Sequence, residues 1–458
     1  MTRVTPPRIA QVAFVVLFGA TLFAPAVFAE RREPQVPVRY PLGPDSLVQA
    51  DVPKGRLEGP FEFRSKIIAP TVRLYWVYVP AQYDPATPAN LLVFQDGNRA
   101  TNPNGVIRVQ NVLENLAAKK QIPPTIGIFI TPGQRGDVYP DTIGTSNPDN
   151  RDREYDVLDD NYARMLIEEI MPEVGKKYRF TDDPARRAIG GSSSGAICAF
   201  TVAWHYPNEF RNVISFIGSF TNIHGGHVYP QMIRESEKKD IRVFLQDGIN
   251  DNRSPQNPER DWYLQNKLMA EAFEAKEYDY AYVLGEGPHA DDHGGAMLPY
   301  MLRWVWRDLP GVNAGEAEEL VAAAKAVKPE RVDAFRGFDA NAKVDAAGMW
   351  TWSQRRRGGE VTSTLTIRSE GGKLAGTLQL PPGFGEDQAP PPAEVVVELE
   401  GNKLYVDGPT RTVTRGDNTF TTTTSYQGII EGDRVVGWEL RDFNGSPRDG
   451  RWEARRSN

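Results

Sequence analysis

The pattern of residues that predicts strands and helices changes along the chain. Between residues 60 and 310, short β-branched and aromatic runs alternate with longer amphipathic runs. This pattern is typical of a largely parallel sheet with helical crossovers. From Met349 onward, short strand-like runs are separated by Gly-Gly, Gly-Asn and Gly-Asp pairs at hairpin spacing. We therefore expect an α/β domain followed by a small antiparallel β-barrel or sandwich.

The individual elements follow from the same periodicities. Strands of the first part are expected at Phe61–Ile68, Val72–Val79, Leu91–Phe94, Ile126–Thr131, Arg187–Gly190, Val213–Gly218, Ile241–Gln246 and Tyr278–Leu284. Helices are expected at Arg108–Lys119, Asn161–Lys177, Gly195–Tyr206, Trp262–Lys276 and Ala296–Arg307. The first two strands have no helix between them, so they should pair antiparallel. The others should be largely parallel, with right-handed crossovers.

The first 29 residues have the composition of a secretory signal. Arg3 and Arg8 precede an apolar stretch that ends at Ala29, with small residues before a plausible cleavage site. An uncleaved membrane anchor is the alternative, because the stretch is just long enough to span a bilayer. We expect cleavage, export to the periplasm or the extracellular space, and no stable membrane insertion afterwards. The expected divisions are a signal peptide (1–29), an α/β domain (30–310), a linker (311–348) and a β domain (349–458).

The charge and the cysteine content narrow the class of protein. The formal net charge is −7, which argues against a nucleic-acid-binding protein, since such proteins need a basic surface. Cys198 is the only cysteine, so no internal disulfide can form. It lies in an apolar run and is expected to be a buried core residue rather than a nucleophile.

Residues Gly191–Gly195 fit the nucleophile motif G-x-S-x-G, with Ser193 as the nucleophile. The motif places serine on a strained turn between a strand and a helix, where neighbouring side chains would clash. A strand candidate precedes it and an apolar helix candidate follows it, which is the context that the motif requires. Ser192 and Ser194 occupy the permissive positions and are not expected to be nucleophiles.

A nucleophilic serine needs a base, and the base needs an orienting acid. In proteins with this motif the acid and then the histidine follow the serine along the chain. Asp251 lies far enough along its loop to reach a histidine, and we favour it over Asp247 at the strand edge. His289 follows the last strand directly, and we favour it over His293.

The oxyanion of an acyl-transfer intermediate needs two N–H donors. One is expected from the backbone of Ser194. The other is expected from the loop after the third strand, at Gly97 or Asn98. This chemistry requires no cofactor.

A metal site is the rival interpretation of the histidines. His289 and His293 are four residues apart, and His224 and His227 are three apart, so a helix would place either pair on one face. Glycines and a proline disfavour a helix in both places, and no third ligand is evident. We therefore expect no metal.

Four segments resemble the enterochelin esterase-like, or esterase D-like, family of esterases: Leu91–Asn98, Gly190–Gly195, Gly248–Asp251 and Gly287–His289. The resemblance covers roughly residues 40 to 310. It implies an α/β-hydrolase fold, no metal, acyl-ester chemistry and a triad falling on Ser193, Asp251 and His289. His293 is followed by two glycines, which leaves the choice of base open.

The resemblance does not name the ester. The expected substrate is a small-molecule or polysaccharide-linked ester, and the sequence does not indicate an oligomeric state. Acyl transfer to a carbohydrate and carbohydrate binding without catalysis are the alternative functions. The C-terminal region is similar to small β-barrel modules appended to exported bacterial enzymes.

Overall fold

A computed structural model describes residues 38–141, 149–331, 335–356, 359–382, 388–415, 418–443 and 446–457. The expected signal peptide lies outside these residues. Within them, no helix is both long and apolar enough to cross a membrane.

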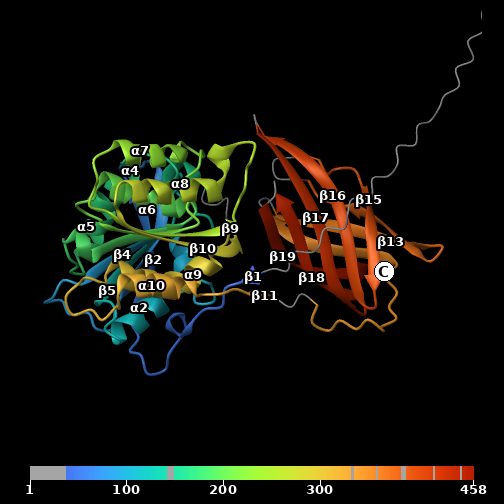
Figure 1. Cartoon of the computed structure of the whole chain (residues 1–458), viewed down its shortest axis with the longest axis horizontal. Coiled ribbons are helices and arrows are strands. Elements are labelled where there is room, and N and C mark those ends of the chain that lie inside the picture. The colour runs from blue at the N-terminus through green and yellow to red at the C-terminus, as the bar shows by residue number, and fades with distance from the viewer. Residues whose placement is uncertain are drawn as a thin grey trace, which may run out of the picture. The chain divides into compact units, whose positions relative to one another are not determined.

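The first part of the chain forms a nine-stranded mixed sheet, in the order β10-β9-β8-β7-β4-β5-β3-β2, with β6 beside β3 (Figure 1). Its strands are β2 (Arg56–Ser65), β3 (Thr71–Val79), β4 (Asn90–Gln95), β5 (Thr125–Ile130), β6 (Gln134–Arg135), β7 (Arg187–Ser192), β8 (Asn212–Phe216), β9 (Arg242–Asn250) and β10 (Asp279–Pro288). Strand β3 pairs antiparallel with β2 and β5, while the pairs from β5 to β10 are parallel. The expected α/β fold and its antiparallel first pair are confirmed.

Helices cover both faces of this sheet (Figure 1). They are α1 (Gly97–Ala100), α2 (Val109–Ala118), α3 (Arg151–Tyr155), α4 (Asn161–Arg164), α5 (Met171–Gly175), α6 (Ser194–His205), α7 (Tyr229–Glu235), α8 (Trp262–Ala275), α9 (Asp291–Val305) and α10 (Ala317–Lys325). A π-helical turn, Met165–Ile170, joins α4 to α5, and 3₁₀ turns span Pro44–Ser46, Pro184–Arg186, Gly226–Val228 and Pro258–Arg260.

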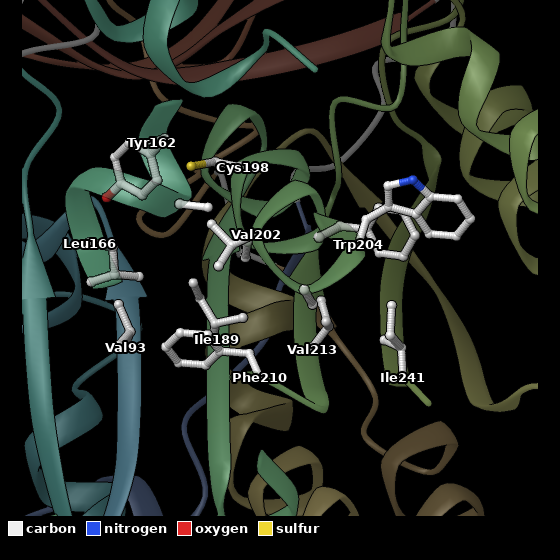
Figure 2. Close-up of a cluster of buried hydrophobic side chains, with 14 of the residues drawn as sticks. Val93, Tyr162, Leu166, Ile189, Cys198, Val202, Trp204, Phe210, Val213 and Ile241 are labelled. Carbon is white, nitrogen blue, oxygen red and sulfur yellow. The ribbon is translucent and has the colours of Figure 1, made fainter. Parts of the chain in front are cut away.

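Two hydrophobic cores hold the helices to the sheet. The first lies under α4 to α8, where Ile189 of β7 and Val213 of β8 pack with Phe200 and Val202 of α6 (Figure 2). Cys198 is part of this core, with 1% of its surface exposed, and burial raises the pKa of its thiol. The prediction that Cys198 is a core residue is confirmed. The second core lies under α2, α9 and α10.

The segment expected to be a linker contains structure that belongs to the second core. Leu320 and Ala324 of helix α10 are buried there with Ala314. A short strand, β11 (Glu330–Arg331), follows and pairs antiparallel with β1 (Val38–Arg39). The packed α/β part of the chain therefore includes α10.

Strands β12 to β19 form a closed antiparallel barrel, so the choice between a barrel and a sandwich is settled. Its strands are β12 (Gly348–Arg356), β13 (Gly359–Glu370), β14 (Lys373–Gln379), β15 (Ala393–Glu400), β16 (Lys403–Arg415), β17 (Asn418–Glu431), β18 (Arg434–Phe443) and β19 (Ser446–Ser457). Trp352, Tyr426 and Trp452 contact one another in its core. These strands lie in the region from Met349 onward in which the sequence predicts strand-like runs.

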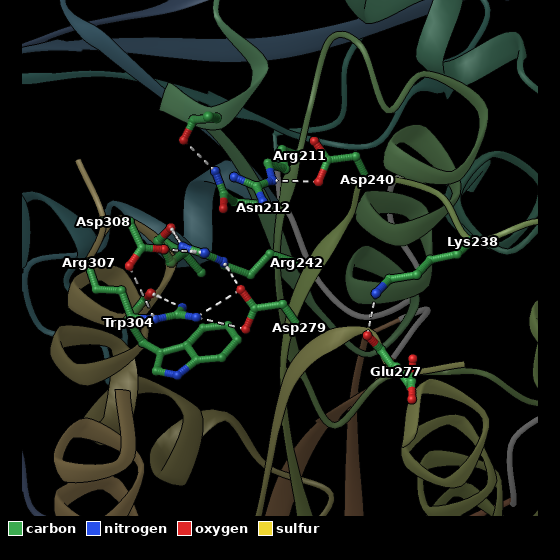
Figure 3. A network of polar contacts seen from close by, with 12 residues as sticks. Arg211, Asn212, Lys238, Asp240, Arg242, Glu277, Asp279, Trp304, Arg307 and Asp308 are labelled. Atoms are coloured by element: carbon green, nitrogen blue, oxygen red, sulfur yellow. Dashed lines mark hydrogen bonds and ion pairs between the residues drawn. The ribbon is translucent and has the colours of Figure 1, made fainter. Parts of the chain in front are cut away.

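The amino ends of β9 and β10 are tied to the end of α9 by ion pairs (Figure 3). Arg242 Nε lies 2.6 Å from Asp279 Oδ2, and Arg242 also pairs with Asp308. Arg307 Nη2 lies 2.8 Å from Asp279 Oδ1, and its guanidinium stacks 4.3 Å from the centre of the Trp304 ring. This network lies at the amino ends of β9 and β10. The candidate catalytic residues follow the carboxyl ends of these strands, on the opposite side of the sheet.

Candidate active site

Ser193 lies on the turn between β7 and α6 with backbone angles φ 57° and ψ −120°. This conformation is strained for any residue with a side chain. A β-carbon on Gly191 would overlap the carbonyl group of Gly195, so the tight turn needs glycine there. The Ser193 N–H donates to the carbonyl of Phe216 at the end of β8 (2.9 Å). The local structure is therefore the elbow that the motif predicts.

His289 bridges the side chains of Ser193 and Asp251. Its Nε2 lies 2.8 Å from Ser193 Oγ, and its Nδ1 lies 2.6 Å from Asp251 Oδ1. The Asp251 side chain is fully buried, while 17% of the His289 side chain is exposed. A carboxylate can only accept, so Nδ1–H donates to Asp251 and Nε2 is left to accept from the Ser193 hydroxyl. The structure thus brings together the three residues that the sequence singled out.

Asp247 and Asp251 are both buried, but their pKa values shift in opposite directions. Burial works to raise the pKa of Asp251, but the charge of His289 and its hydrogen bond hold that pKa below its ordinary value. Burial, and then the charge of Asp251, raise the pKa of Asp247 well above its ordinary value. Asp247 therefore carries the proton of the pair, and Asp251 is the ionised partner of His289.

His293 lies in the first turn of α9 and points away from this triad. Its Nδ1 lies 3.1 Å from Gln246 Nε2, and its ring stacks on Tyr40 with the ring centres 4.0 Å apart. Burial lowers the pKa of His293 to about 4, so the ring is neutral at pH 7. Neither His293 nor Asp247, the alternative base and acid, contacts Ser193 or His289.

The expected oxyanion donors belong to the first turns of two helices. Gly97 and Asn98 open α1 and Ser194 opens α6, and N–H groups in a first turn have no partner within the helix. A β-carbon on Gly195 would lie 3.2 Å from Asp96 Oδ2, so the two first turns are neighbours. The arrangement keeps all three candidate donors on the elbow side of the sheet.

Charged side chains brace both turns. Arg151 donates to Asp96 through Nε (2.9 Å) and Nη2 (2.6 Å). Asp291 accepts from Ser192 Oγ and from Arg99. Ser192 is therefore held by α9, which is consistent with its place at a permissive position of the motif.

Two further residues contact the nucleophile or its base, and the motifs did not indicate their role. Ser219 Oγ lies 3.0 Å from Ser193 Oγ. Trp262 Nε1 donates to Ser219 Oγ (3.0 Å), and the Trp262 ring meets the His289 ring edge-on at 5.8 Å.

Asp156 lies behind the elbow and is 1% exposed. Burial raises its pKa to about 7, against the opposing hydrogen bond from Ser194 and the charge of Arg151. Its chain neighbour Glu154 forms a fully buried ion pair with Arg73. Neither acid forms a hydrogen bond with Ser193 or His289, whose side-chain partners are Ser219 and Asp251 and each other.

The remaining histidines pair with single acids or with the backbone. His224 Nε2 lies 3.2 Å from Asp152 Oδ2, and His227 Nε2 lies 3.6 Å from Glu259 Oε2. In the described segments, no group of three histidine, cysteine, aspartate or glutamate side chains is placed to hold a metal ion.

Comparisons with known proteins give one family match and several relatives of low identity. Residues 71–288 match the family described as Putative esterase. The iron(III) enterobactin esterase of Dickeya dadantii is 26% identical over 148 residues, which are 32% of this chain and 30% of that protein. The uncharacterized protein YbbA of Bacillus subtilis is 21% identical over 204 residues, 44% of this chain and 79% of that protein.

A solved structure, the enterobactin esterase of Shigella flexneri with enterobactin, has 21% identity and a TM-score of 0.45. That alignment covers 57% of this chain and 61% of the Shigella chain. The chain therefore spans less than a third of the Dickeya esterase and less than two thirds of the Shigella esterase. The part of the chain that carries the elbow lies within residues 71–288 and is therefore similar to this esterase family.

Proposed function

We propose that this protein is a carboxylic ester hydrolase in which Ser193, His289 and Asp251 form the catalytic triad. The observation that carries the proposal is the position of His289, whose two ring nitrogens lie 2.8 Å from Ser193 Oγ and 2.6 Å from Asp251 Oδ1. The match of residues 71–288 to the esterase family supports the reaction class.

The reaction has two stages. His289 Nε2 takes the Ser193 proton as Oγ attacks the ester carbonyl, and the Ser194 N–H and an N–H at Gly97 or Asn98 bind the oxyanion. His289 then gives its proton to the departing alcohol, which leaves an acyl-Ser193. Water repeats the sequence and releases the acid. Asp251 keeps the imidazole in the correct tautomer and stabilises its charged form.

The match to the esterase family supports ester hydrolysis but does not indicate which ester is the substrate. Small-molecule and polysaccharide-linked esters are both compatible with the proposal, and transfer of the acyl group to a sugar would use the same intermediate. A panel of nitrophenyl acetate and butyrate, feruloyl-arabinose, acetyl-xylan and a catecholate siderophore, with and without a sugar acceptor, ranks these possibilities. Export is part of the proposal, and the mature N-terminus of secreted protein tests it.

The decisive experiment is active-site labelling with a fluorophosphonate probe, which reacts only with an activated serine. Wild type should be labelled on Ser193, and Ser193→Ala should lose labelling and about a million-fold in kcat while keeping its fold. Ser192→Ala and Ser194→Ala serve as controls for the register of the motif. If either control abolishes labelling while Ser193→Ala keeps it, the nucleophile is misassigned.

A further inference from the structure

The Ser219 hydroxyl lies within hydrogen-bonding distance of Ser193 Oγ, the oxygen atom that would attack the substrate. The triad of Ser193, His289 and Asp251 does not itself require this contact. It lies just after β8, the neighbour of β7 in the sheet, and is fully buried. Its backbone N–H donates to the Ser193 carbonyl (3.1 Å). Ser219 is thus attached to the elbow by its main chain as well as by its side chain.

The direction of each hydrogen bond around Ser219 follows from the donors available. An indole N–H can only donate, so Ser219 Oγ accepts from Trp262 Nε1. The Ser193 hydroxyl proton is committed to His289 Nε2, because Nδ1–H is committed to Asp251. The proton between the two serine oxygens, which are 3.0 Å apart, therefore belongs to Ser219.

We propose that Ser219 is a further catalytic residue, donating a hydrogen bond to Ser193 Oγ, and that Trp262 is the residue that positions it. The inference rests on the proposed function of Ser193. As Oγ attacks, its own proton moves to His289 Nε2 and the oxygen carries partial negative charge. Ser219 keeps its proton throughout, and its hydrogen bond strengthens with that charge. No additional reactant is needed.

Trp262 contributes by occupying an acceptor position of Ser219. With the indole N–H in place, the Ser219 proton turns toward Ser193. The same ring packs edge-on against His289, so a change at Trp262 must preserve the ring to isolate the N–H group. Phenylalanine meets this condition, because it keeps an aromatic ring and removes the donor.

The test measures attack by Ser193 in four proteins: wild type, Ser219→Ala, Trp262→Phe and the double variant. The readouts are kcat/KM for nitrophenyl acetate and the second-order rate constant of fluorophosphonate labelling. Ser219→Ala should lower both by about tenfold to a hundredfold, the range for a hydrogen bond to a charged group. Trp262→Phe should lower both by about threefold to tenfold in wild type and have less than about a twofold effect in Ser219→Ala.

Ser215→Ala is the matched control, because it removes another fully buried serine hydroxyl from β8 itself. It should leave both rate constants within about twofold of wild type. If Ser219→Ala does not fold, Ser219→Cys replaces it, since a thiol is a weak donor of similar shape and should also slow labelling.

The proposal is overturned if Ser219→Ala, or Ser219→Cys in its place, labels within about twofold of wild type. It is also overturned if Trp262→Phe costs the same factor in both backgrounds, because Trp262 would then act independently of Ser219. Failure of the proposed function gives a different result: wild type would not be labelled, or Ser193→Ala would remain active.

Discussion

A β-carbon on Gly248 would overlap the carbonyl oxygen of Gly287. These glycines belong to the ends of the neighbouring parallel strands β9 and β10. Asp251 follows the first and His289 follows the second, so the hydrogen bond between them depends on the close approach of the two backbones. The position of Asp251 relative to His289 is thus determined by the backbone of the sheet as well as by the two side chains.

Replacing Gly248 with alanine should separate these two loops. We expect Gly248→Ala to lower kcat/KM for nitrophenyl acetate by at least about a hundredfold, because small misplacements of catalytic groups are costly. The melting temperature should fall by only a few degrees, since the change lies at the edge of the sheet. An equal change at Gly175, which is exposed, has open surroundings and has no positive φ, is the activity control. Near-normal activity of Gly248→Ala would contradict the stated dependence.

His289→Ala should be far more damaging to hydrolysis than His293→Ala. The first removes the base and should lower kcat by about 10⁴- to 10⁶-fold. The second removes a ring that contacts Gln246 and Tyr40, so it should affect stability more than turnover. Steady-state kinetics and thermal unfolding on both variants give the ranking, and the reverse order of activities would move the base to His293.

Asp247 should act as a hydrogen-bond donor to Asp251 rather than as a charge. Asp247→Asn provides an amide donor of the same shape, so we expect kcat/KM within about fivefold of wild type. Asp247→Ala removes the donor and should cost more than Asp247→Asn. Asp251→Asn removes the charge beside His289 and should cost about 10⁴-fold. If Asp247→Asn is as inactive as Asp251→Asn, the assignment of the proton to Asp247 is wrong.

The neutral His293 ring should make the protein less stable in acid. Its pKa is about 4 in the folded protein and about 6.5 in the unfolded chain. As the pH falls through this range, the unfolded chain binds the proton first, so the free energy of unfolding decreases. From pH 7 to pH 5 this loss should be about 2 kcal/mol.

His293→Asn keeps a side-chain acceptor for Gln246 and removes the titration. Urea unfolding at pH 7 and pH 5 should therefore show a smaller loss for the variant than for wild type. Asp156, whose pKa is raised to about 7, shifts stability in the opposite sense, but it is present in both proteins and cancels in the difference. Equal losses would show that His293 is not buried as a neutral ring.

The three triad residues could be predicted from the sequence because each of them follows a predicted strand. Ser193, Asp251 and His289 follow the carboxyl ends of β7, β9 and β10, and in a parallel sheet such ends meet at one edge. Ser219 could not be found in this way. Its contact with Ser193 depends on β8 lying beside β7, and the order of strands in a sheet is not encoded in the periodicity of any one of them.

The start of helix α9 was harder to predict for a local reason. Gly294 and Gly295 indicated a break, so the helix was expected only from Ala296, but it begins at Asp291. The glycines are there because side chains would overlap Phe216 and the carbonyl of Val106.

The last prediction concerns the part of the chain that hydrolysis requires. Ser193, Asp251, His289 and Ser219 all precede helix α10, and the barrel has its own buried core. The linker expected at 311–348 would place the end of a shortened protein near residue 312. That end would remove Leu320 and Ala324 from the second core of the α/β part, at a cost of several kcal/mol. We therefore expect a protein ending after Arg331 to fold and to hydrolyse nitrophenyl acetate within about twofold of the full-length rate.

A protein ending at Val312 should have a lower melting temperature and a greater tendency to aggregate. Loss of small-ester activity in a folded protein ending after Arg331 would mean that the barrel contributes to the active site.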